Sequence, residues 1–427
     1  MELKKYKLSD VAKVEISSVD KKTKAGEIPV RLCNFTDVYH NWAITSDMAD
    51  SFMEASANPN EIEKFTIKKG QVAFTKDSET RNDIGISTYI ADDFYNILLG
   101  YHCALITPDE TKLCGKYLNA FMHSTYIQKY FENSASGSGQ RYTLSLETIN
   151  SMPILLPSLD KQKRIGEIFT LLDNKIKLNR AVNQNLEAMA KQLYDYWFVQ
   201  FDFPDENGRP YKSSGGKMVW NEKLKREIPE GWNNGMLIDI ANITMGQSPD
   251  GSSYNEVGEG MLFYQGSTDF GMRFPSVRQY TTAPSRYAKR GDILMSVRAP
   301  VGSINIANND CCIGRGLSAI NSKLGSTTHL YYILNDLRIA FEQRNAAGTT
   351  FGSITKEDLY SLPIIIPSHE VIRAFDKICS PMFDRQMMLG EEIDNLTKQR
   401  DELLPLLMNG QASVNYHLSA KTEITFG

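Results

Sequence analysis

The stretch "MPILLPS" (152–158) decides how the chain is organised, because it recurs as "LPIIIPS" (362–368) at an offset of 210 residues. Each copy is an apolar run between two prolines. A residue that precedes proline is kept out of the helical region, and proline is tolerated at strand edges and ends. Ser158 and Ser368, directly after the second proline, suit the N-cap of a helix. Each copy is therefore predicted to be a short strand that leads straight into a helix.

The match between the two parts of the chain extends well beyond these joints. At the same offset, "LSLETINSMPILLPS" (144–158) lies on "ITKEDLYSLPIIIPS" (354–368). Further upstream "KKGQVAFT" (68–75) resembles "KRGDILMS" (289–296), with the drift in offset that loops of unequal length produce. We interpret the chain as two related halves, each with a mixed segment of short strands and turns, the joint and a long helix.

Beyond each joint, apolar residues recur in alternating steps of four and three, which is the heptad spacing of a coiled-coil seam. Asn179 and Asn183 interrupt the first stripe, and Gln386 and Arg400 interrupt the second; polar seam residues lower stability but fix register and partner. Because each helix has one strong apolar stripe, we predict that the two helices pack on each other. Two independent core helices in separate domains are the alternative. The expected packing residues are Leu172, Ile176, Leu186, Leu193, Trp197, Leu389, Ile393, Leu396, Leu403 and Leu407.

Composition leaves few classes of protein open. The net charge of −4 argues only mildly against a nucleic-acid binder, because such binding depends on where Lys and Arg lie. No apolar run approaches the roughly 18 residues of a membrane span. The beginning "MELKKYKLSD" lacks the apolar core of a secretory signal. The six cysteines have no CxxC spacing, so we interpret them as reduced thiols of a cytoplasmic protein.

No motif of a common catalytic site is found. The chain lacks the phosphate-binding P-loop, the GxSxG elbow and the HExxH zinc motif. It also lacks the Asn/Asp-Pro-Pro-aromatic loop of adenine methyltransferases, and neither Pro204-Asp205 nor Pro249-Asp250 is followed by the acidic and lysine residues of a magnesium nuclease. With the duplicated organisation, this favours a binding protein over an enzyme, with no metal and no cofactor held by this chain.

These features together resemble the specificity (S) subunit of type I restriction–modification enzymes. The resemblance is carried by the two joints and by "GDILMSVRAPVGSINIA" (291–307). It is also carried by "FDFPDENGRPYKSSGGKM" with the following "IPEGW", and by "ELLPLLMNGQ" (402–411). It covers nearly the whole chain, and the order of the motifs is more specific than any one of them.

The resemblance implies an α+β fold with two similar α/β target-recognition domains. They would be separated by two long helices that pair as an antiparallel coiled coil, in a pseudo-two-fold internal repeat. The expected parts are recognition domain 1 (1–157), spacer helix 1 (158–198), a connector (199–231), recognition domain 2 (232–367), spacer helix 2 (368–410) and a C-terminal tail (411–427).

The resemblance also implies a non-catalytic subunit that reads a bipartite, asymmetric site in double-stranded DNA. Two modification subunits would bind S-adenosylmethionine and methylate adenine, and restriction subunits would use ATP and Mg²⁺. The alternatives are a stand-alone bipartite DNA-binding protein and, more distantly, a fused methyltransferase.

The helix faces away from the seam also carry apolar residues, such as Leu178, Val182 and Met189 in the first helix, which two helices alone would leave exposed. We expect helices of partner subunits to cover them. Burial against the chain's own recognition domains is the alternative.

Arginine reads guanine edges and grips phosphates through two parallel hydrogen bonds, and the second half of the chain is rich in it. Arg141 and Tyr142 follow the flexible "SASGSGQ", which is typical of a loop that enters a groove. For each residue the alternative is a solvated surface side chain. The expected DNA-binding residues are Asn34, Lys76, Arg81, Arg141, Tyr142, Gln265, Ser267, Arg273, Arg278, Arg286, Arg298 and Arg315.

Overall fold

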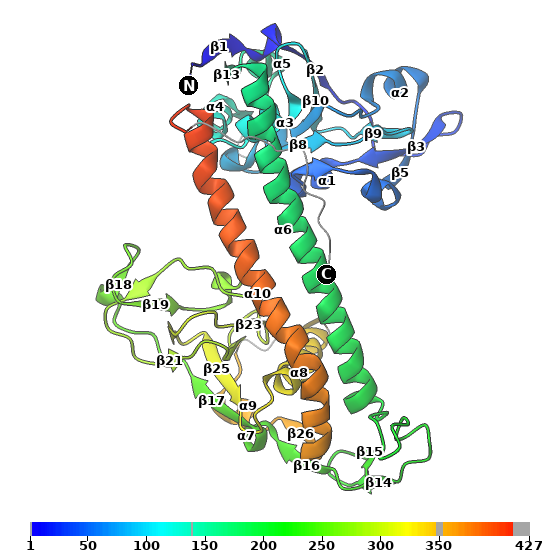
Figure 1. The fold of residues 1–427 in the computed structure, drawn as a ribbon, viewed down its shortest axis with the longest axis vertical. Helices are drawn as coiled ribbons and strands as arrows, with labels where there is room; N and C mark the ends of the chain where they lie inside the picture. The colour runs from blue at the N-terminus through cyan, green and yellow to red at the C-terminus, as the bar shows by residue number, and fades with distance from the viewer. Residues whose placement is uncertain (1, 138–139, 347–352, 413–427) are drawn as a thin grey trace. The chain divides into compact units, whose positions relative to one another are not determined.

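A computed structural model describes residues 2–137, 140–346 and 353–412 of the chain (Figure 1). Most of the expected C-terminal tail, from residue 413 on, lies outside the described residues. The described residues form two compact units. Unit 1 draws on Met1–Leu178 and Asp394–Gly427, and unit 2 on Asn179–Ile393. The helices α6 (Leu159–Tyr194) and α10 (His369–Met408) each contribute one part to each unit.

Unit 1 is built on a five-stranded sheet. Its strands, in spatial order, are β2 (Ala12–Ile16), β10 (Cys103–Pro108), β6 (Val72–Thr75), β8 (Ser87–Ile90) and β4 (Ala43–Ile44). All pairs in this sheet are antiparallel except β4 with β8. A second sheet has the order β5 (Met53–Ala57), β3 (Ile28–Cys33) and β9 (Ile97–Leu99), and a third has β11 (Ser136–Gly137), β12 (Tyr142–Thr143) and β7 (Asp77–Ser78).

Both faces of the five-stranded sheet are covered, because successive side chains of a strand point to opposite faces. Phe74 and Ile106 pack into one cluster with the helices, while Ala73 and Leu105 pack into another on the opposite face. The helices of this unit are α1 (Phe35–His40), α2 (Pro59–Phe65), α3 (Gly115–Met122), α4 (Thr125–Ser134) and α5 (Leu146–Asn150). Early residues of α6 and late residues of α10 join the helical cluster, namely Ile165, Phe169, Leu404, Leu407 and Met408.

Unit 2 has the same kind of sheet, again with both faces covered. Ile293 and Met295 point into the cluster that includes the long helices, and Leu294 points into the opposite cluster. The four-stranded sheet has the order β17 (Ala241–Met245), β25 (Leu317–Ser322), β22 (Ile293–Ser296) and β23 (Ile304–Ile306). A second sheet has β18 (Tyr254–Asn255), β20 (Tyr280–Thr281), β19 (Met261–Tyr264), β24 (Cys311–Ile313) and β21 (Tyr287–Ala288). The shorter helices are α7 (Leu237–Ile240), α8 (Thr327–Ala346) and α9 (Lys356–Tyr360).

The two proline-bracketed joints are strands that lead into helices, as the sequence predicted. In unit 1, β13 (Pro153–Leu156) pairs antiparallel with β1 (Lys4–Lys7), and α6 begins at Leu159. In unit 2, β26 (Pro363–Ile366) pairs antiparallel with β16 (Asn233–Met236), and α10 begins at His369. Each joint therefore ties the last strand of its unit to an earlier one, β13 to β1 and β26 to β16.

Polar side chains at the start of each long helix fix how it leaves the joint. The buried amide of Gln162 accepts from the backbone N–H of Cys114 at 2.9 Å and donates to the carbonyl of Pro157 at 3.0 Å. In α10, the carboxylate of Asp376 accepts from the hydroxyl of Ser326 at 2.7 Å and from that of Thr328. In this way α6 is held against the loop that precedes α3, and α10 is held against the loop that precedes α8.

The expected connector is folded onto unit 2 by its aromatic residues. A π-helical turn, Asp195–Val199, follows α6, and β14 (Met218–Asn221) and β15 (Arg226–Pro229) form a hairpin. The ring of Phe203 stacks on Tyr211 at 4.7 Å and on Trp232 at 5.0 Å, measured between ring centroids. The stacked rings explain why a stretch rich in Gly, Ser and charge is ordered.

His329 is buried and His123 is half-buried, and both are neutral, which predicts a loss of stability in mild acid. Burial lowers the pKa of His329, whose ring lies 4.6 Å from that of Phe198, to about 3, and lowers the pKa of His123 to about 4. Their ordinary pKa in an unfolded chain is about 6.5, so the unfolded state binds more protons at low pH. The free energy of unfolding is therefore not reduced by these histidines above about pH 6.5. As the pH falls from there toward the pKa values of the folded state, each histidine lowers it by up to about 1.4 kcal/mol per pH unit.

Urea unfolding at several pH values between 7.5 and 4.5 measures this effect. In the variant His329→Gln the free energy of unfolding should depend less on pH than in the parent chain. The matched control is His40→Gln, because the side chain of His40 is exposed. Equal slopes for the parent chain and His329→Gln would contradict the prediction.

Candidate nucleic-acid interface

The small sheet of β7, β12 and β11 in unit 1 gathers four of the expected DNA-binding residues around one carboxylate. Tyr142 pairs with Ser78, and Thr143 with Asp77. The side chain of Asp77 is 8% exposed and accepts hydrogen bonds from the ammonium of Lys76 at 2.8 Å and from the hydroxyl of Thr143 at 2.5 Å. Burial by itself would raise the pKa of Asp77, but these donors and a histidine outweigh it and hold the pKa below its ordinary value.

The histidine is His102, which sequence reasoning missed. Its Nδ1 lies 2.5 Å from Oδ2 of Asp77, and the guanidinium Nη2 of Arg141 lies 3.0 Å from its Nε2. The backbone of His102 has a φ of +72°, a left-handed conformation that is uncommon outside glycine and that recurs at functional sites. The sequence shows only "GYHC" between two apolar strands, so it contains no signal for this role.

Arg81 and Tyr142 complete this group. The guanidinium carbon of Arg81 lies 5.1 Å from the centroid of the Tyr142 ring. Arg81 and Arg141 are exposed, whereas the Asp77 carboxylate beneath them is not. We call Lys76, Arg81, His102, Arg141 and Tyr142 the basic cluster of unit 1. Three of its members are always cationic, and one aromatic ring lies among them, which suits an anionic, base-bearing ligand.

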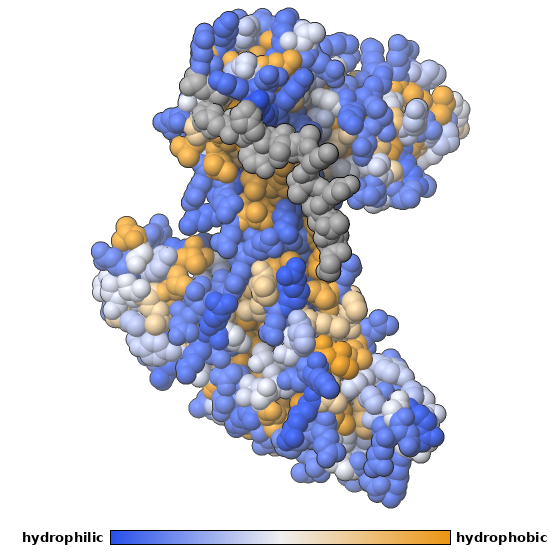
Figure 2. Space-filling model, in the orientation of Figure 1, coloured by the Kyte–Doolittle hydropathy of each residue, from blue (hydrophilic) through white to orange (hydrophobic). Residues whose placement is uncertain are grey.

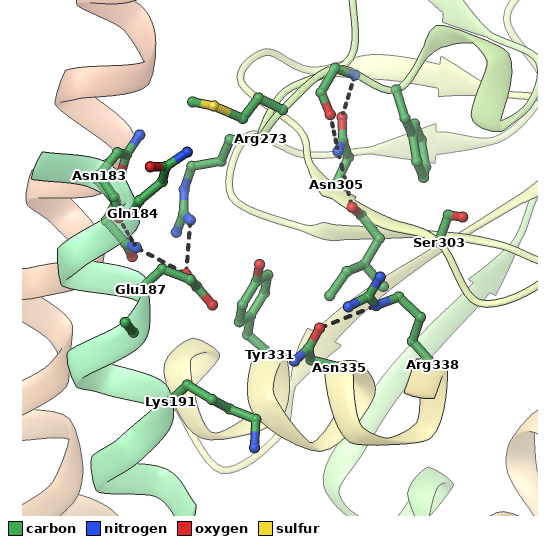
Figure 3. Close-up of a pocket in the computed structure, with 16 residues that line it drawn as sticks. Asn183, Gln184, Glu187, Lys191, Arg273, Ser303, Asn305, Tyr331, Asn335 and Arg338 are labelled. Carbon is green, nitrogen blue, oxygen red and sulfur yellow. Dashed lines mark hydrogen bonds and ion pairs between the residues drawn. The ribbon is translucent and has the colours of Figure 1, made fainter. Parts of the chain in front are cut away.

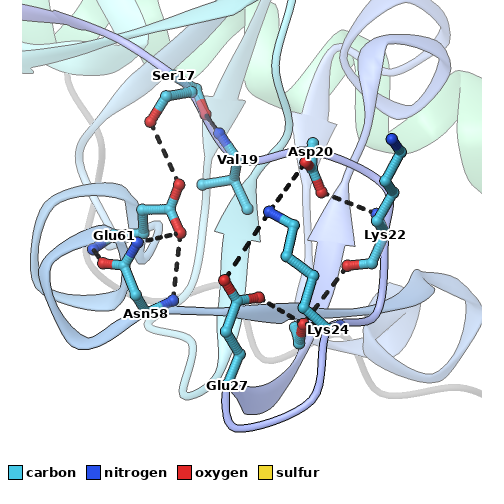
Figure 4. A network of polar contacts seen from close by, with 10 residues as sticks. Ser17, Val19, Asp20, Lys22, Lys24, Glu27, Asn58 and Glu61 are labelled. Carbon is cyan, nitrogen blue, oxygen red and sulfur yellow. Dashed lines mark hydrogen bonds and ion pairs between the residues drawn. The ribbon is translucent and has the colours of Figure 1, made fainter.

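A second charged group in unit 1 has no such surplus of positive charge (Figure 4). The ammonium of Lys24 lies 3.0 Å from Asp20 and 3.8 Å from Glu27, and Ser56 donates to Glu27 at 2.6 Å. Exposed ion pairs of this kind contribute little to stability and offer no excess cation to a phosphate. This network therefore provides a control surface and is not a candidate site.

Asn34 does not face solvent. It is 7% exposed, and its backbone N–H donates to Asp37 at 2.7 Å in the capping box of α1. Its side-chain oxygen would lie 2.9 Å from a Cβ at Gly100. A cap residue in the core of unit 1 has a structural role, so we leave Asn34 out of the proposed DNA surface.

In unit 2, hydrogen bonds join the segments that carry six of the expected residues. The backbone N–H of Gly316 donates to the carbonyl of Gln265 at 3.2 Å, and the N–H of Ile313 donates to that of Arg286 at 2.9 Å. The N–H of Val297 donates to Gly316 at 2.9 Å. Arg286, Arg298 and Arg315 are all exposed and lie next to these bonds in the chain.

Arg278 is exposed and binds Asp269, at the end of the 3₁₀ turn Ser267–Asp269 that contains Ser267. We call Gln265, Ser267, Arg278, Arg286, Arg298 and Arg315 the arginine group of unit 2.

Arg273 lies in a cleft of about 660 Å³ between its loop and the long helices (Figure 3). It is 9% exposed, and its guanidinium points toward Glu187 of α6, with Nη1 3.4 Å from Oε2. An arginine held in this way cannot reach a base edge, so we leave it out of the proposed DNA surface.

None of the ten expected helix-packing residues is exposed. Ile176, Trp197, Leu389, Ile393 and Leu407 are buried, and Leu172, Leu186, Leu193, Leu396 and Leu403 are half-buried. The seam polar residue Gln386 is also buried and donates to the carbonyl of Asn183 at 3.3 Å. Other apolar side chains of the long helices are exposed, among them Leu171, Leu178, Met189 and Met388. The visible face of the molecule is otherwise mostly hydrophilic, with scattered apolar patches (Figure 2).

Other kinds of site can be assessed over the same residues. No group of three or more His, Cys, Asp or Glu that could hold a metal ion occurs among the described residues. No described helix is both long enough and apolar enough to cross a membrane. All six cysteines are free thiols, and burial raises the pKa of Cys103 and of Cys311 to about 12.

Comparison with known proteins gives the family. The family described as "Type I restriction modification DNA specificity domain" matches residues 1–188 and again residues 229–381. The chain belongs to this family. The first matched stretch ends within α6, and the second ends within α10.

Relatives agree along most of the chain. It is 29% identical over 365 residues to the MjaX type I restriction enzyme specificity subunit of Methanocaldococcus jannaschii, covering 83% of this chain and 81% of that one. It is 24% identical over 466 residues to the HindI specificity subunit of Haemophilus influenzae, covering 96% and 99%. The crystal structure of a type I restriction–modification S subunit from M. genitalium has a TM-score of 0.60 at 14% identity over 96% of each chain, a likeness of fold.

Proposed function

We propose that this chain is the sequence-specific DNA-recognition subunit of a type I restriction–modification complex, without catalytic activity of its own. Its recognition domains would be residues 1–157 and 232–367, and each would read one half of a bipartite DNA site. The basic cluster around Asp77 carries the proposal, because it places three cations and an aromatic ring on one polar sheet within a chain of net charge −4. The arginine group would be the corresponding surface of the second domain.

We further propose that α6 and α10 pair as an antiparallel coiled coil and that the chain is a pseudo-two-fold repeat. Contacts within each unit support this direction. In unit 2, Trp197 in the π-helical turn that follows α6 lies 5.9 Å from Phe375 early in α10, measured between ring centroids. In unit 1, Phe169 early in α6 shares a cluster with Leu404 late in α10. The two strand-to-helix joints support the repeat, because each pairs with the first strand of its expected recognition domain, 1–157 or 232–367.

The exposed apolar side chains of the long helices would be covered by two modification subunits, with restriction subunits bound in turn. Isolated exposed residues are ordinary, but several on two adjacent helices are typical of a surface that receives further helices. The partners would hold S-adenosylmethionine, ATP and Mg²⁺, and the complex would work in the cytoplasm.

Co-expression with the modification subunit of the same system tests the proposal. We expect a stable complex that methylates one bipartite sequence in host DNA, seen by sequencing the methylated bases with and without this chain. If the chain binds such a sequence but never forms the complex, the stand-alone DNA-binding protein is favoured. Binding of S-adenosylmethionine to the isolated chain would favour the fused methyltransferase.

Arg141 is expected to read or grip DNA from the basic cluster. Replacing it by alanine should weaken binding by about 1–3 kcal/mol. If Arg141 reads a base, the loss will be confined to one position of one half-site; if it grips a phosphate, binding will weaken for all sequences alike and its salt dependence will decrease by about one charge. Competition binding of the complex to single-base variants, at two salt concentrations, separates these outcomes. Lys24→Ala in the network of Figure 4 is the control and should leave binding unchanged. An Arg141→Ala complex that binds every variant like the parent would remove the basic cluster from the DNA surface.

A further inference from the structure

The loop Phe270–Phe274 of unit 2 reaches from the domain's sheets to both long helices. We call it the anchoring loop. The side chain of Arg273 is 8% exposed, and its guanidinium carbon lies 4.7 Å from the centroid of the Phe383 ring of α10 and 5.6 Å from that of Tyr331 of α8. Its Nη1 reaches Oε2 of Glu187 on α6 (Figure 3). One side chain of the domain therefore contacts three helices.

The same Glu187 oxygen is held from the other side by α10. It accepts a hydrogen bond from Nε2 of Gln386 at 2.9 Å, and Gln386 is 1% exposed. The polar residue that interrupts the apolar stripe of α10 thus has a partner. It fixes the carboxylate that Arg273 binds, so the domain, α6 and α10 are joined by one chain of polar contacts.

Phe274 adds an apolar contact next to this chain. It is 6% exposed and packs with Ile306 and Phe383. A Cβ at Gly390 of α10 would lie 2.4 Å from Cε2 of Phe274, so the ring rests directly on the helix backbone. On the domain side, the carbonyl of Arg273 accepts from the N–H of Ile306 in β23 at 2.9 Å. The anchoring loop is thus bonded to the sheet at one end and pressed on a helix at the other.

A buried ion pair is a poor source of stability, because taking both charges out of water offsets much of their attraction. Such pairs can instead select one geometry, since removing or displacing one partner leaves a buried charge unpaired. Arg290 and Glu391 also join this domain to α10, but they are 60% and 37% exposed. If the domain shifts on the helix, an exposed ion pair of that kind loses little free energy, because water solvates both charges.

We propose that Arg273 and Phe274 are positioning residues that fix the orientation of the second recognition domain on the long helices. They thereby determine how strictly the complex demands one spacer length between its two half-sites. This inference rests on the proposed function. It differs from a role in DNA contact, because neither side chain needs to touch DNA.

Arg273→Met tests the inference, because methionine keeps the apolar length of the side chain and removes its charge. Each variant is co-expressed with the modification subunit, and methylated sites in host DNA are sorted by the length of the unread spacer. Arg273→Met should keep both half-site sequences. It should raise methylation at spacers one base pair shorter or longer by about tenfold relative to the native spacing, equivalent to about 1.4 kcal/mol. Arg290→Met is the matched control and should keep the parent's spacing.

Gly390→Ala provides a second variant in which every polar contact remains. Its added methyl group must displace the Phe274 ring, so it too should broaden or shift the accepted spacer. If Arg273→Met methylates no site because it fails to fold, Gly390→Ala decides alone. Strict native spacing in either folded variant, at the parent's level of methylation, overturns the inference. If the parent complex itself methylates no bipartite sequence, the proposed function fails instead.

Discussion

Replacing Phe375 by alanine should lower the free energy of unfolding of unit 2 by about 3–5 kcal/mol, which is the range for deleting a fully buried phenylalanine. Phe375 is 0% exposed. Its ring centroid lies 5.0 Å from that of Phe198 and 5.9 Å from that of Trp197. It therefore joins the beginning of α10 to the π-helical turn that follows α6. Because folded domains are stable by only about 5–15 kcal/mol, this loss is a large part of the total.

Urea unfolding followed by tryptophan fluorescence measures the effect, since Trp197 and Trp232 lie in the same cluster. Ile378→Ala, on the same helix but at a side chain that is 43% exposed, is the matched control and should cost much less. Phe375→Leu retains most of the apolar volume and should lie between the two. If Phe375→Ala is no more destabilising than Ile378→Ala, the aromatic cluster does not hold the helices together.

The sequence predicted the strands of the two joints and the helices that follow them, but not which other strands they pair with. The proline pairs predicted β13 and β26 and the start of each long helix, because steric restriction at proline acts on adjacent residues. The partner of β26 is β16, "NNGM", which has no β-strand character of its own. It becomes a strand because β26 presents a free edge, and that edge is supplied by residues more than 100 positions away.

The candidate nucleic-acid interface also contains residues that the sequence predicted and one whose role depends on residues distant in the chain. Lys76, Arg81, Arg141 and Tyr142 were expected from residue type and loop position, and the structure brings them together. His102 was missed because its role depends on the buried Asp77. Arg273 was expected to contact DNA because it is one of the arginines in which the second half of the chain is rich, and the structure places it in a cleft. The two rings that enclose it, Tyr331 and Phe383, come from distant segments.

Inserting one helical turn of four residues into both long helices should lengthen the spacer that the complex accepts by about two base pairs. Four residues add about 6 Å along a helix, and base pairs are stacked about 3.4 Å apart. The insertion points are after Leu178 in α6 and after Ile393 in α10, where the chain passes between the two units. A turn of four residues also keeps each apolar stripe within about 40° of its original direction, because each residue advances about 100° around the helix.

The control is an insertion of two residues at the same points, which turns each stripe by about 200° and would expose the seam. We expect the four-residue variant to form the complex and to methylate its own half-sites at the longer spacing, with the native spacing reduced to background. The two-residue variant should lose the complex. Sequencing the methylated bases of the host gives both results at once. A four-residue variant that still methylates only the native spacing would show that helix length does not set the spacer, and that the domains reach their half-sites by moving on the helices.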